Sequence, residues 1–183
     1  TLHYACDSYL CVEPYCSAEF QTKSFQMKSK NEITIEQLNL SCRHVDEMMA
    51  AGVTENFAIR ILELFTDVYG KLHKGGSATP HHVDQVELWS AEAKKVREFT
   101  PNAEPNDHFV VEHGTPKRGF ARMTMDLYRR GELNEKTMIQ LVEDYWKLAV
   151  ITIEENKRLN KLARSKVFKT PDERWAAAGI KFP

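Results

Sequence analysis

Apolar residues recur at steps of three and four along the first third of the chain, which is the pattern of amphipathic helices. Thr34 and Gln37 have the spacing of a capping box and predict that a helix begins there and ends at Gly52. A second helix is predicted to begin at Thr54. Its expected core-facing residues are Phe57, Ile61, Leu64, Phe65 and Val68. The two helices should form a hairpin.

Prolines and turn residues divide the middle of the chain. Thr79-Pro80 combines a cap residue with a proline at the first helical position, so a third helix is predicted from there through Val96. Its apolar positions are Val83, Val86, Leu88, Trp89 and Val96. The segment 101–106 contains two Pro and two Asn and is predicted to be a connecting loop.

Beyond this loop the pattern alternates between short apolar runs and helical periods. Phe109 to Val111 and the β-branched run Ala149 to Ile153 predict two short strands that could pair. Three helices are predicted around them: Pro116 to about Arg130, one capped by Asn134, and Glu154 to about Ser165. The fold class is therefore a mainly helical α+β protein, with five or six helices and a small two-stranded element.

The same pattern predicts the organisation of the chain. Residues 1–31 are expected to be irregular, 32–100 to be helical, and 107–183 to form a strand-helix-helix-strand-helix region. A length of 183 residues suits one compact unit.

Composition narrows the class of protein. No apolar run approaches the roughly 20 residues that cross a bilayer, and the first residues lack the pattern of a secretion signal, so the sequence predicts a soluble, cytoplasmic protein without a membrane partner. The net charge of −1 argues against coating nucleic acid by bulk electrostatics. However, Lys117 to Lys169 holds 13 Lys and Arg against 7 Asp and Glu. This part of the chain is expected to face phosphate or to present a solvated basic helix.

The most informative motif is Glu112-His113, an acid-histidine pair at the end of the first predicted strand. Imidazole can act as a base near neutral pH, and carboxylate and amide oxygens suit a hard cation such as Mg²⁺ or Mn²⁺. We therefore expect His113 as general base and Glu112, with Asn156 or Asn160, at a divalent metal. The cations expected near phosphates are Lys117, Arg118, Lys157, Arg158, Lys161 and Arg164.

These residues resemble the His-Me finger, or HNH-like, nucleases, in which an acid-His pair with a nearby proline ends one strand of a hairpin and a following helix carries a His or Asn. The match covers Phe109 to Pro116 and Ala149 to Leu162. The resemblance implies a metal-dependent nuclease or phosphodiesterase that acts on nucleic acid. The chain departs from the family in having Glu at position 112 where Asp is usual, in the two helices predicted between the strands, and in lacking a CxxC pair.

Two alternatives stay open. Cys6, Cys11 and Cys16 with nearby His could hold zinc, although their spacing is wider than in most zinc sites and free thiols are favoured, with Cys42 in the core of the first helix. The protein could also be a non-enzymatic helical adaptor, inhibitor or immunity factor of a bacterial or phage conflict system, which would bind a protein partner.

Overall fold

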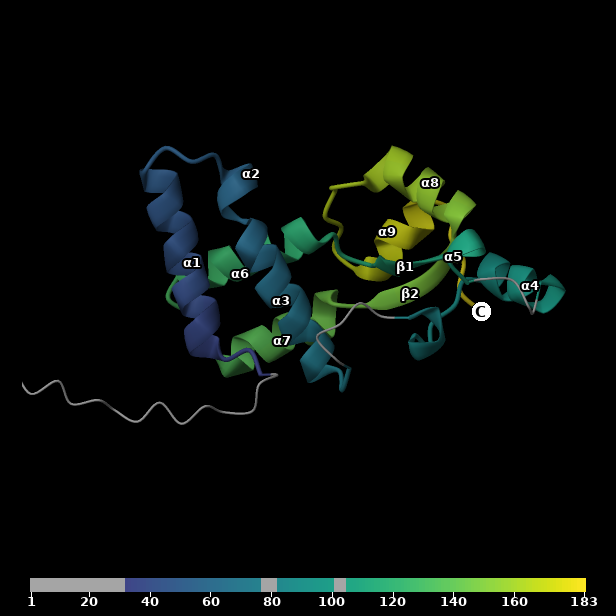
Figure 1. Ribbon diagram of the computed structural model, residues 1–183, viewed down its shortest axis with the longest axis horizontal. Coiled ribbons are helices and arrows are strands. Elements are labelled where there is room, and N and C mark those ends of the chain that lie inside the picture. Colours follow the sequence, from purple (N-terminus) through teal and green to yellow (C-terminus); the bar gives the residue numbers. More distant parts are fainter. Residues whose placement is uncertain (1–31, 77–81, 101–104) are drawn as a thin grey trace, which may run out of the picture. The chain divides into compact units, whose positions relative to one another are not determined.

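The computed structural model describes residues 32–76, 82–100 and 105–183, with the side chains of Pro105 and Asn106 excepted. The predicted Cys6, Cys11 and Cys16 site and the irregular segment 1–31 lie outside these ranges. The helices of at least seven residues are α1 (Ile35–Ala50), α3 (Arg60–His73), α4 (Ala91–Phe99), α6 (Lys117–Arg129), α7 (Glu135–Tyr145), α8 (Ile153–Ala163) and α9 (Pro171–Ala177). Shorter helical turns are α2 (Glu55–Ala58), η1 (Val83–Gln85) and α5 (Pro105–His108). Figure 1 shows their arrangement.

The predicted two-stranded element is confirmed. Strand β1 (Phe109–His113) pairs antiparallel with β2 (Leu148–Thr152), with Val111 opposite Val150 and His113 opposite Leu148. The mainly helical α+β class is therefore correct, and the described residues hold one more helix of this length than the upper number expected. The regions before and after segment 101–104 belong to one unit, because α3 contacts α6 and α4 contacts β2.

Residues that mark the ends of helices predicted the position of several helices correctly. The capping box of Thr34 and Gln37 begins α1, and a second one, formed by Thr152 and Glu155, begins α8. Each box satisfies free N–H groups at a helix start within a few residues of sequence. Gly131 follows the end of α6 with a φ of 70°, a conformation that glycine adopts without strain.

The predicted third helix is wrong before Ser90, whereas its last part, up to Val96, is helical in α4. Between residue 82 and Ser90 only η1 is helical, and Trp89 forms an isolated bridge with Val150. The Val150 N–H donates to the carbonyl oxygen of Leu88, and the Ser90 N–H donates to that of Val150. This pairing with β2 outweighs the helical pattern, and α4 begins afresh because the Ser90 hydroxyl accepts from the Ala93 N–H.

The core-facing side of the second predicted helix is also different from expectation. Phe57, Ile61 and Leu64 are exposed, whereas Ala58, Ile59 and Leu62 are buried. The buried side of α3 continues through polar residues, namely Thr66, Asp67 and Lys71. The buried side of this helix therefore combines apolar and polar residues, and it is rotated from the predicted one.

In the described ranges the core consists of one helical cluster and two further clusters, one on each face of the sheet. Alternation along β2 sends Ala149 and Ile151 into a cluster with residues of α8 and α9, and sends Val150 into a cluster with residues of η1 and α4. The helical cluster joins α1, α2, α3, α6 and α7 and includes the buried free thiol of Cys42, as predicted. Burial and the nearby Asp46 carboxylate raise the pKa of this thiol to about 12.

Candidate functional site

His113, at the end of β1, faces α3. Its Nε2 lies 2.8 Å from Oδ1 of Asp67, a side chain that is only 3% exposed. The other oxygen of this carboxylate, Oδ2, accepts from Lys117 Nζ at 2.7 Å and from Lys71 Nζ at 2.9 Å. The rings of Trp146 and His113 are nearly perpendicular, with a centroid distance of 6.2 Å. We call Asp67, Lys71, His113 and Lys117 the Asp67 cluster.

The Asp67 carboxylate is held in its charged form. Burial by itself would raise the pKa of this group, but hydrogen bonds and charge from His113, Lys117 and Lys71 outweigh burial and hold the pKa far below its usual range. One buried carboxylate therefore binds three donors and orients the imidazole. In this arrangement His113 joins β1 to α3, and Lys117 joins α6 to the same carboxylate.

Glu112 points to the opposite face of the sheet, because successive side chains of a strand alternate. Its Oε1 accepts from Arg174 Nη1 at 2.8 Å, and the Arg174 side chain is only 2% exposed. Nη1 of Arg174 also donates to the His113 carbonyl oxygen at 2.8 Å, and its Nε donates to the Ala163 carbonyl oxygen at 3.2 Å. Arg174 thereby connects α9, the end of β1 and the end of α8.

The expected metal ligands form hydrogen bonds with other partners. Asn160 Nδ2 donates to Asn156 Oδ1 at 3.0 Å on α8, and no hydrogen bond between described residues joins either amide to Glu112 or His113. Within the described ranges, no group of three or more His, Cys, Asp and Glu side chains is placed to hold a metal ion. With Glu112 neutralised by Arg174 and His113 engaged by Asp67, these donors do not fit a shared divalent cation as they are arranged here.

The cations of α6 are paired with acids of the first helices. Arg118 Nε donates to Glu63 Oε1 at 2.6 Å, and Arg122 donates to Glu55 through two nitrogens, at 2.8 and 3.2 Å. Arg129 Nη2 donates to Asp46 Oδ1 at 2.8 Å, and Lys117 belongs to the Asp67 cluster. Lys117 and Arg118, which were expected near phosphates, therefore take part in ion pairs that join helices.

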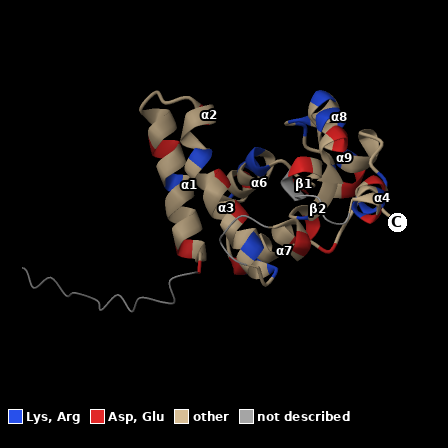
Figure 2. Ribbon diagram, turned by 45° about the vertical axis from the view of Figure 1, so that its right-hand side comes forward, with Lys and Arg blue, Asp and Glu red and all other residues tan. Residues whose placement is uncertain are grey.

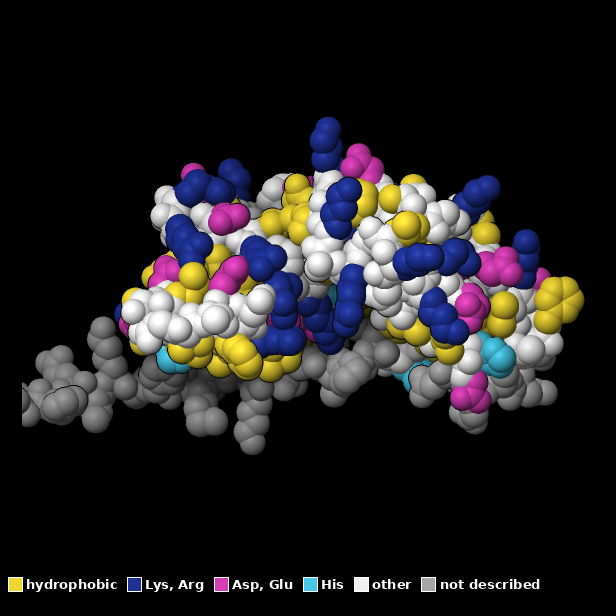
Figure 3. Space-filling model, turned by 90° about the horizontal axis from the view of Figure 1, so that it is seen from above, with side chains coloured by type: hydrophobic (Ala, Val, Ile, Leu, Met, Phe, Trp, Pro, Cys, Tyr) yellow, Lys and Arg dark blue, Asp and Glu magenta, His cyan; other side chains and the backbone are white. Residues whose placement is uncertain are grey.

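The cations of α8 differ. Residues 156–169, which we call the α8 basic segment, hold six Lys and Arg and no Asp or Glu. Lys157 donates to Glu154 at 2.6 Å, and Lys166 lies over the Phe168 ring. Arg158, Lys161 and Arg164 are exposed and make no hydrogen bond or ion pair with any residue of the described ranges. Figure 2 shows basic positions on both α6 and α8, and Lys and Arg side chains recur across the face seen in Figure 3.

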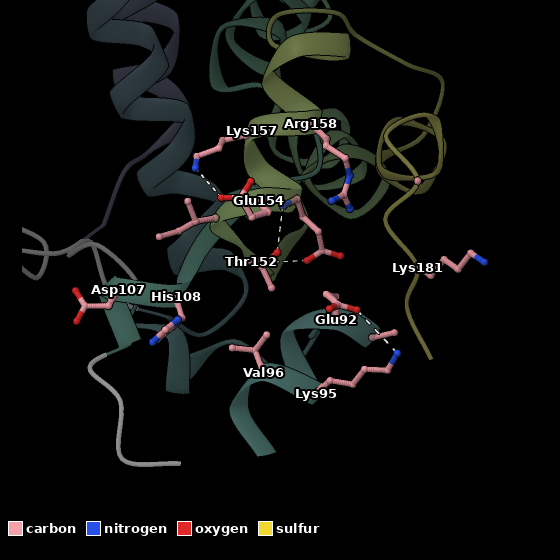
Figure 4. Close-up of a pocket in the computed structure, with 14 residues that line it drawn as sticks. Glu92, Lys95, Val96, Asp107, His108, Thr152, Glu154, Lys157, Arg158 and Lys181 are labelled. Atoms are coloured by element: carbon pink, nitrogen blue, oxygen red, sulfur yellow. Dashed lines mark hydrogen bonds and ion pairs between the residues drawn. The ribbon is translucent and has the colours of Figure 1, made fainter. Parts of the chain in front are cut away.

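An open cavity of about 690 Å³ lies where α8 begins (Figure 4). Its walls carry two compensated pairs, Lys157 with Glu154 and Lys95 with Glu92. The side chains of Arg158, Lys181 and Asp107 also line it and make no hydrogen bond or ion pair with a described residue. The unpaired charge of α8 thus continues from its exposed face to the edge of this cavity.

Two important residues had no expected role. Asp67 binds the His113 imidazole and lies 46 residues away along the chain. Arg174 binds the His113 carbonyl oxygen and lies 61 residues away. Asp67 carried no signal in the sequence, because it lies outside the apolar face that is predicted for its helix. Arg174 carried none either, since its burial depends on how α9 packs against the sheet.

None of the helices in residues 32–76, 82–100 and 105–183 combines the length and apolar character that a bilayer span requires. Comparisons with protein-family models, with curated proteins and with solved structures found no match for this chain.

Proposed function

We propose that this protein binds nucleic acid through the α8 basic segment, residues 156–169. The observation that carries the proposal is the set of three exposed cations, Arg158, Lys161 and Arg164, that have no acidic partner in the described parts of the chain. Free Lys and Arg side chains neutralise phosphates and release counterions, which is the main source of nonspecific affinity for nucleic acid. The asparagines of the same helix add hydrogen-bonding groups for bases and sugars.

A nucleic acid fits this segment better than an anionic membrane does. Helices that bind in a membrane surface insert an apolar face between the lipids. The apolar face of α8, with Leu159 and Ala163, is buried in the cluster beneath the helix. The face that remains available is mainly charged and polar, with Leu162 as an exposed apolar side chain, and it suits contact with phosphates at a surface.

Binding should be moderate and sensitive to salt. Nonspecific complexes have dissociation constants of about 10⁻⁴ to 10⁻⁶ M at physiological salt, and their affinity falls steeply as the salt concentration rises. The test is fluorescence anisotropy with labelled single-stranded and double-stranded DNA and RNA. The variant R158Q/K161Q/R164Q should bind at least about tenfold more weakly than the wild type at roughly 0.1 M salt.

The matched control is R118Q/R122Q/R129Q on α6, which removes the same formal charge from residues that are already paired. It should keep most of the wild-type affinity. An equal reduction of affinity in both variants would mean that only net charge matters and would overturn the assignment to α8. Binding to anionic vesicles in place of nucleic acid would overturn it too.

Metal-dependent cleavage stays a separate prediction of the HNH-like resemblance. It is supported by the antiparallel pairing of β1 with β2 and by the helix that follows β2 directly. The test is incubation of bound DNA with Mg²⁺ or Mn²⁺, followed by gel analysis. Cleavage by the wild type that disappears in H113A would support the prediction, and DNA that stays intact with the wild type would contradict it.

A further inference from the structure

Glu155 brings a carboxylate oxygen without a donor to the cavity where α8 begins. Its side chain lines this cavity, although the residue is only 2% exposed. Its Oε2 accepts from the Ser90 hydroxyl at 2.7 Å and from the Thr152 N–H at 2.8 Å. Its Oε1 makes no hydrogen bond with a described residue and is not completely enclosed by protein. The cavity therefore offers one hydrogen-bond acceptor that has no donor within the described chain.

The first residues of two helices hold the Glu155 side chain in one orientation. Ser90, the N-cap of α4, donates to this side chain and accepts from the Ala93 N–H. Thr152, the N-cap of α8, forms a capping box with Glu155. Because these bonds fix Oε2, they also fix the position of Oε1. A buried acceptor without a donor is unfavourable, and a bound molecule that donates an N–H group to Oε1 would remove this penalty.

The other walls of the cavity suit a planar ring with a phosphate attached. Ala91, Val96 and Ile153 contribute apolar surface. Figure 4 shows Arg158 extending from α8 towards the cavity, and this cation has no partner among the described residues. The volume of about 690 Å³ lies within the range of about 300 to 1,000 Å³ that is usual for small-molecule sites.

The charges around the cavity favour a ligand with two kinds of group. Arg158 and Lys181 are cations without an ion-pair partner in the described ranges, and Asp107 and Glu155 are acids without one. Asp107 and Lys181 lie at opposite sides of the cavity (Figure 4). A molecule that carries both a phosphate and N–H donors matches this mixture better than a simple anion or a simple cation does. A nucleotide carries both groups.

We propose that the cavity binds one unpaired nucleotide of a strand that lies along the α8 basic segment, with Glu155 accepting from the amino group of its base. The inference rests on the proposed function, since Arg158 belongs to both the segment and the cavity. Cytosine, adenine and guanine carry such an amino group, whereas thymine and uracil carry carbonyl groups. A base in a duplex is stacked and paired, so the selection applies to single strands.

The test compares the binding of oligo(dC) and oligo(dU) of equal length by fluorescence anisotropy. The wild type should bind oligo(dC) at least about fivefold more tightly, because a carboxylate accepts from the cytosine amino group and uracil has a carbonyl oxygen there. E155Q keeps an oxygen for Ser90 and Thr152 and replaces Oε1 by an amide NH₂ group. The variant should lose the preference or reverse it. Its melting temperature should stay close to that of the wild type, since Gln also serves in a capping box.

The matched control is E173Q, because Glu173 is an exposed acid of α9 that does not line the cavity. This variant should keep the preference for oligo(dC). Equal affinity of the wild type for both strands would overturn the cavity proposal alone, as would a preference that survives E155Q or disappears in E173Q. Free dCMP that competes as well as oligo(dC) would overturn the role of the strand. A wild type that binds no strand at all would overturn the proposed function as well.

Discussion

Helices α6 and α8 are both rich in Lys and Arg, yet their charges have different surroundings. In α6, Lys117, Arg118, Arg122 and Arg129 each bind an acid of α1, α2 or α3. In α8 and the segment after it, Arg158, Lys161 and Arg164 have no such partner in the described ranges. The first set holds helices together, and the second set is free to meet an external anion.

An excess of basic residues in a sequence therefore does not locate a binding surface. The excess between Lys117 and Lys169 includes both helices, although only one of them presents uncompensated charge. What separates them is the position of acids that are distant in sequence, such as Glu63 and Asp67. Substitutions that remove members of each set test this division.

The largest effect is expected from D67N. The neutral amide leaves Lys71 buried without its acid and also weakens the hold on His113 and Lys117. Removing one partner of a buried ion pair costs about 3 to 5 kcal/mol. Urea unfolding of the variant at neutral pH measures this destabilisation. A change below about 1 kcal/mol would mean that the Asp67 cluster does not stabilise the packing of α6 on α3.

The destabilisation in D67N should also depend on pH. Because the pKa of Asp67 is lowered in the folded state, its charge stabilises the fold above the ordinary carboxyl pKa of about 3.9, and this contribution declines as pH falls further. The difference in unfolding free energy between wild type and D67N should therefore shrink below about pH 4. A difference that stays constant from neutral pH down to about pH 3 would contradict this explanation.

A smaller effect is expected from H113A. The substitution removes one of three donors to the Asp67 carboxylate and leaves Lys71 and Lys117 in place. Removing a hydrogen bond to a charged group costs about 1.5 to 3 kcal/mol. Thermal and urea unfolding measure it. A nuclease base without a structural role would leave stability unchanged, so this variant separates the two roles of His113.

A still smaller effect is expected from R122Q, which breaks the two-nitrogen pair with Glu55 on the surface. Exposed ion pairs contribute about 0.2 to 1 kcal/mol. The matched variant R164Q removes a cation of the α8 basic segment that has no partner among the described residues and should leave stability within error. Equal destabilisation by the two variants would mean that the paired cations of α6 stabilise the fold no more than the unpaired cations of the α8 basic segment.

Features that depend on neighbouring residues could be predicted from the sequence, whereas features that depend on distant residues could not. The cap at Thr34 and the two strands were predictable, because their signals lie within a few neighbouring residues. The break at Ser90 was not predictable, since it depends on hydrogen bonds with Val150, far along the chain. For the same reason the partners of Glu112 and His113 were missed, and a local acid-histidine motif was assigned to one site although its side chains serve two.

The most direct test of the distinction between α6 and α8 is the slope of log K for DNA binding against log salt concentration. Each phosphate contact makes this negative slope steeper by about 0.9 for duplex DNA. R158Q/K161Q/R164Q should make the slope shallower by roughly two to three, and R118Q/R122Q/R129Q should leave it close to that of the wild type. A slope that falls in the α6 variant and stays unchanged in the α8 variant would contradict the account.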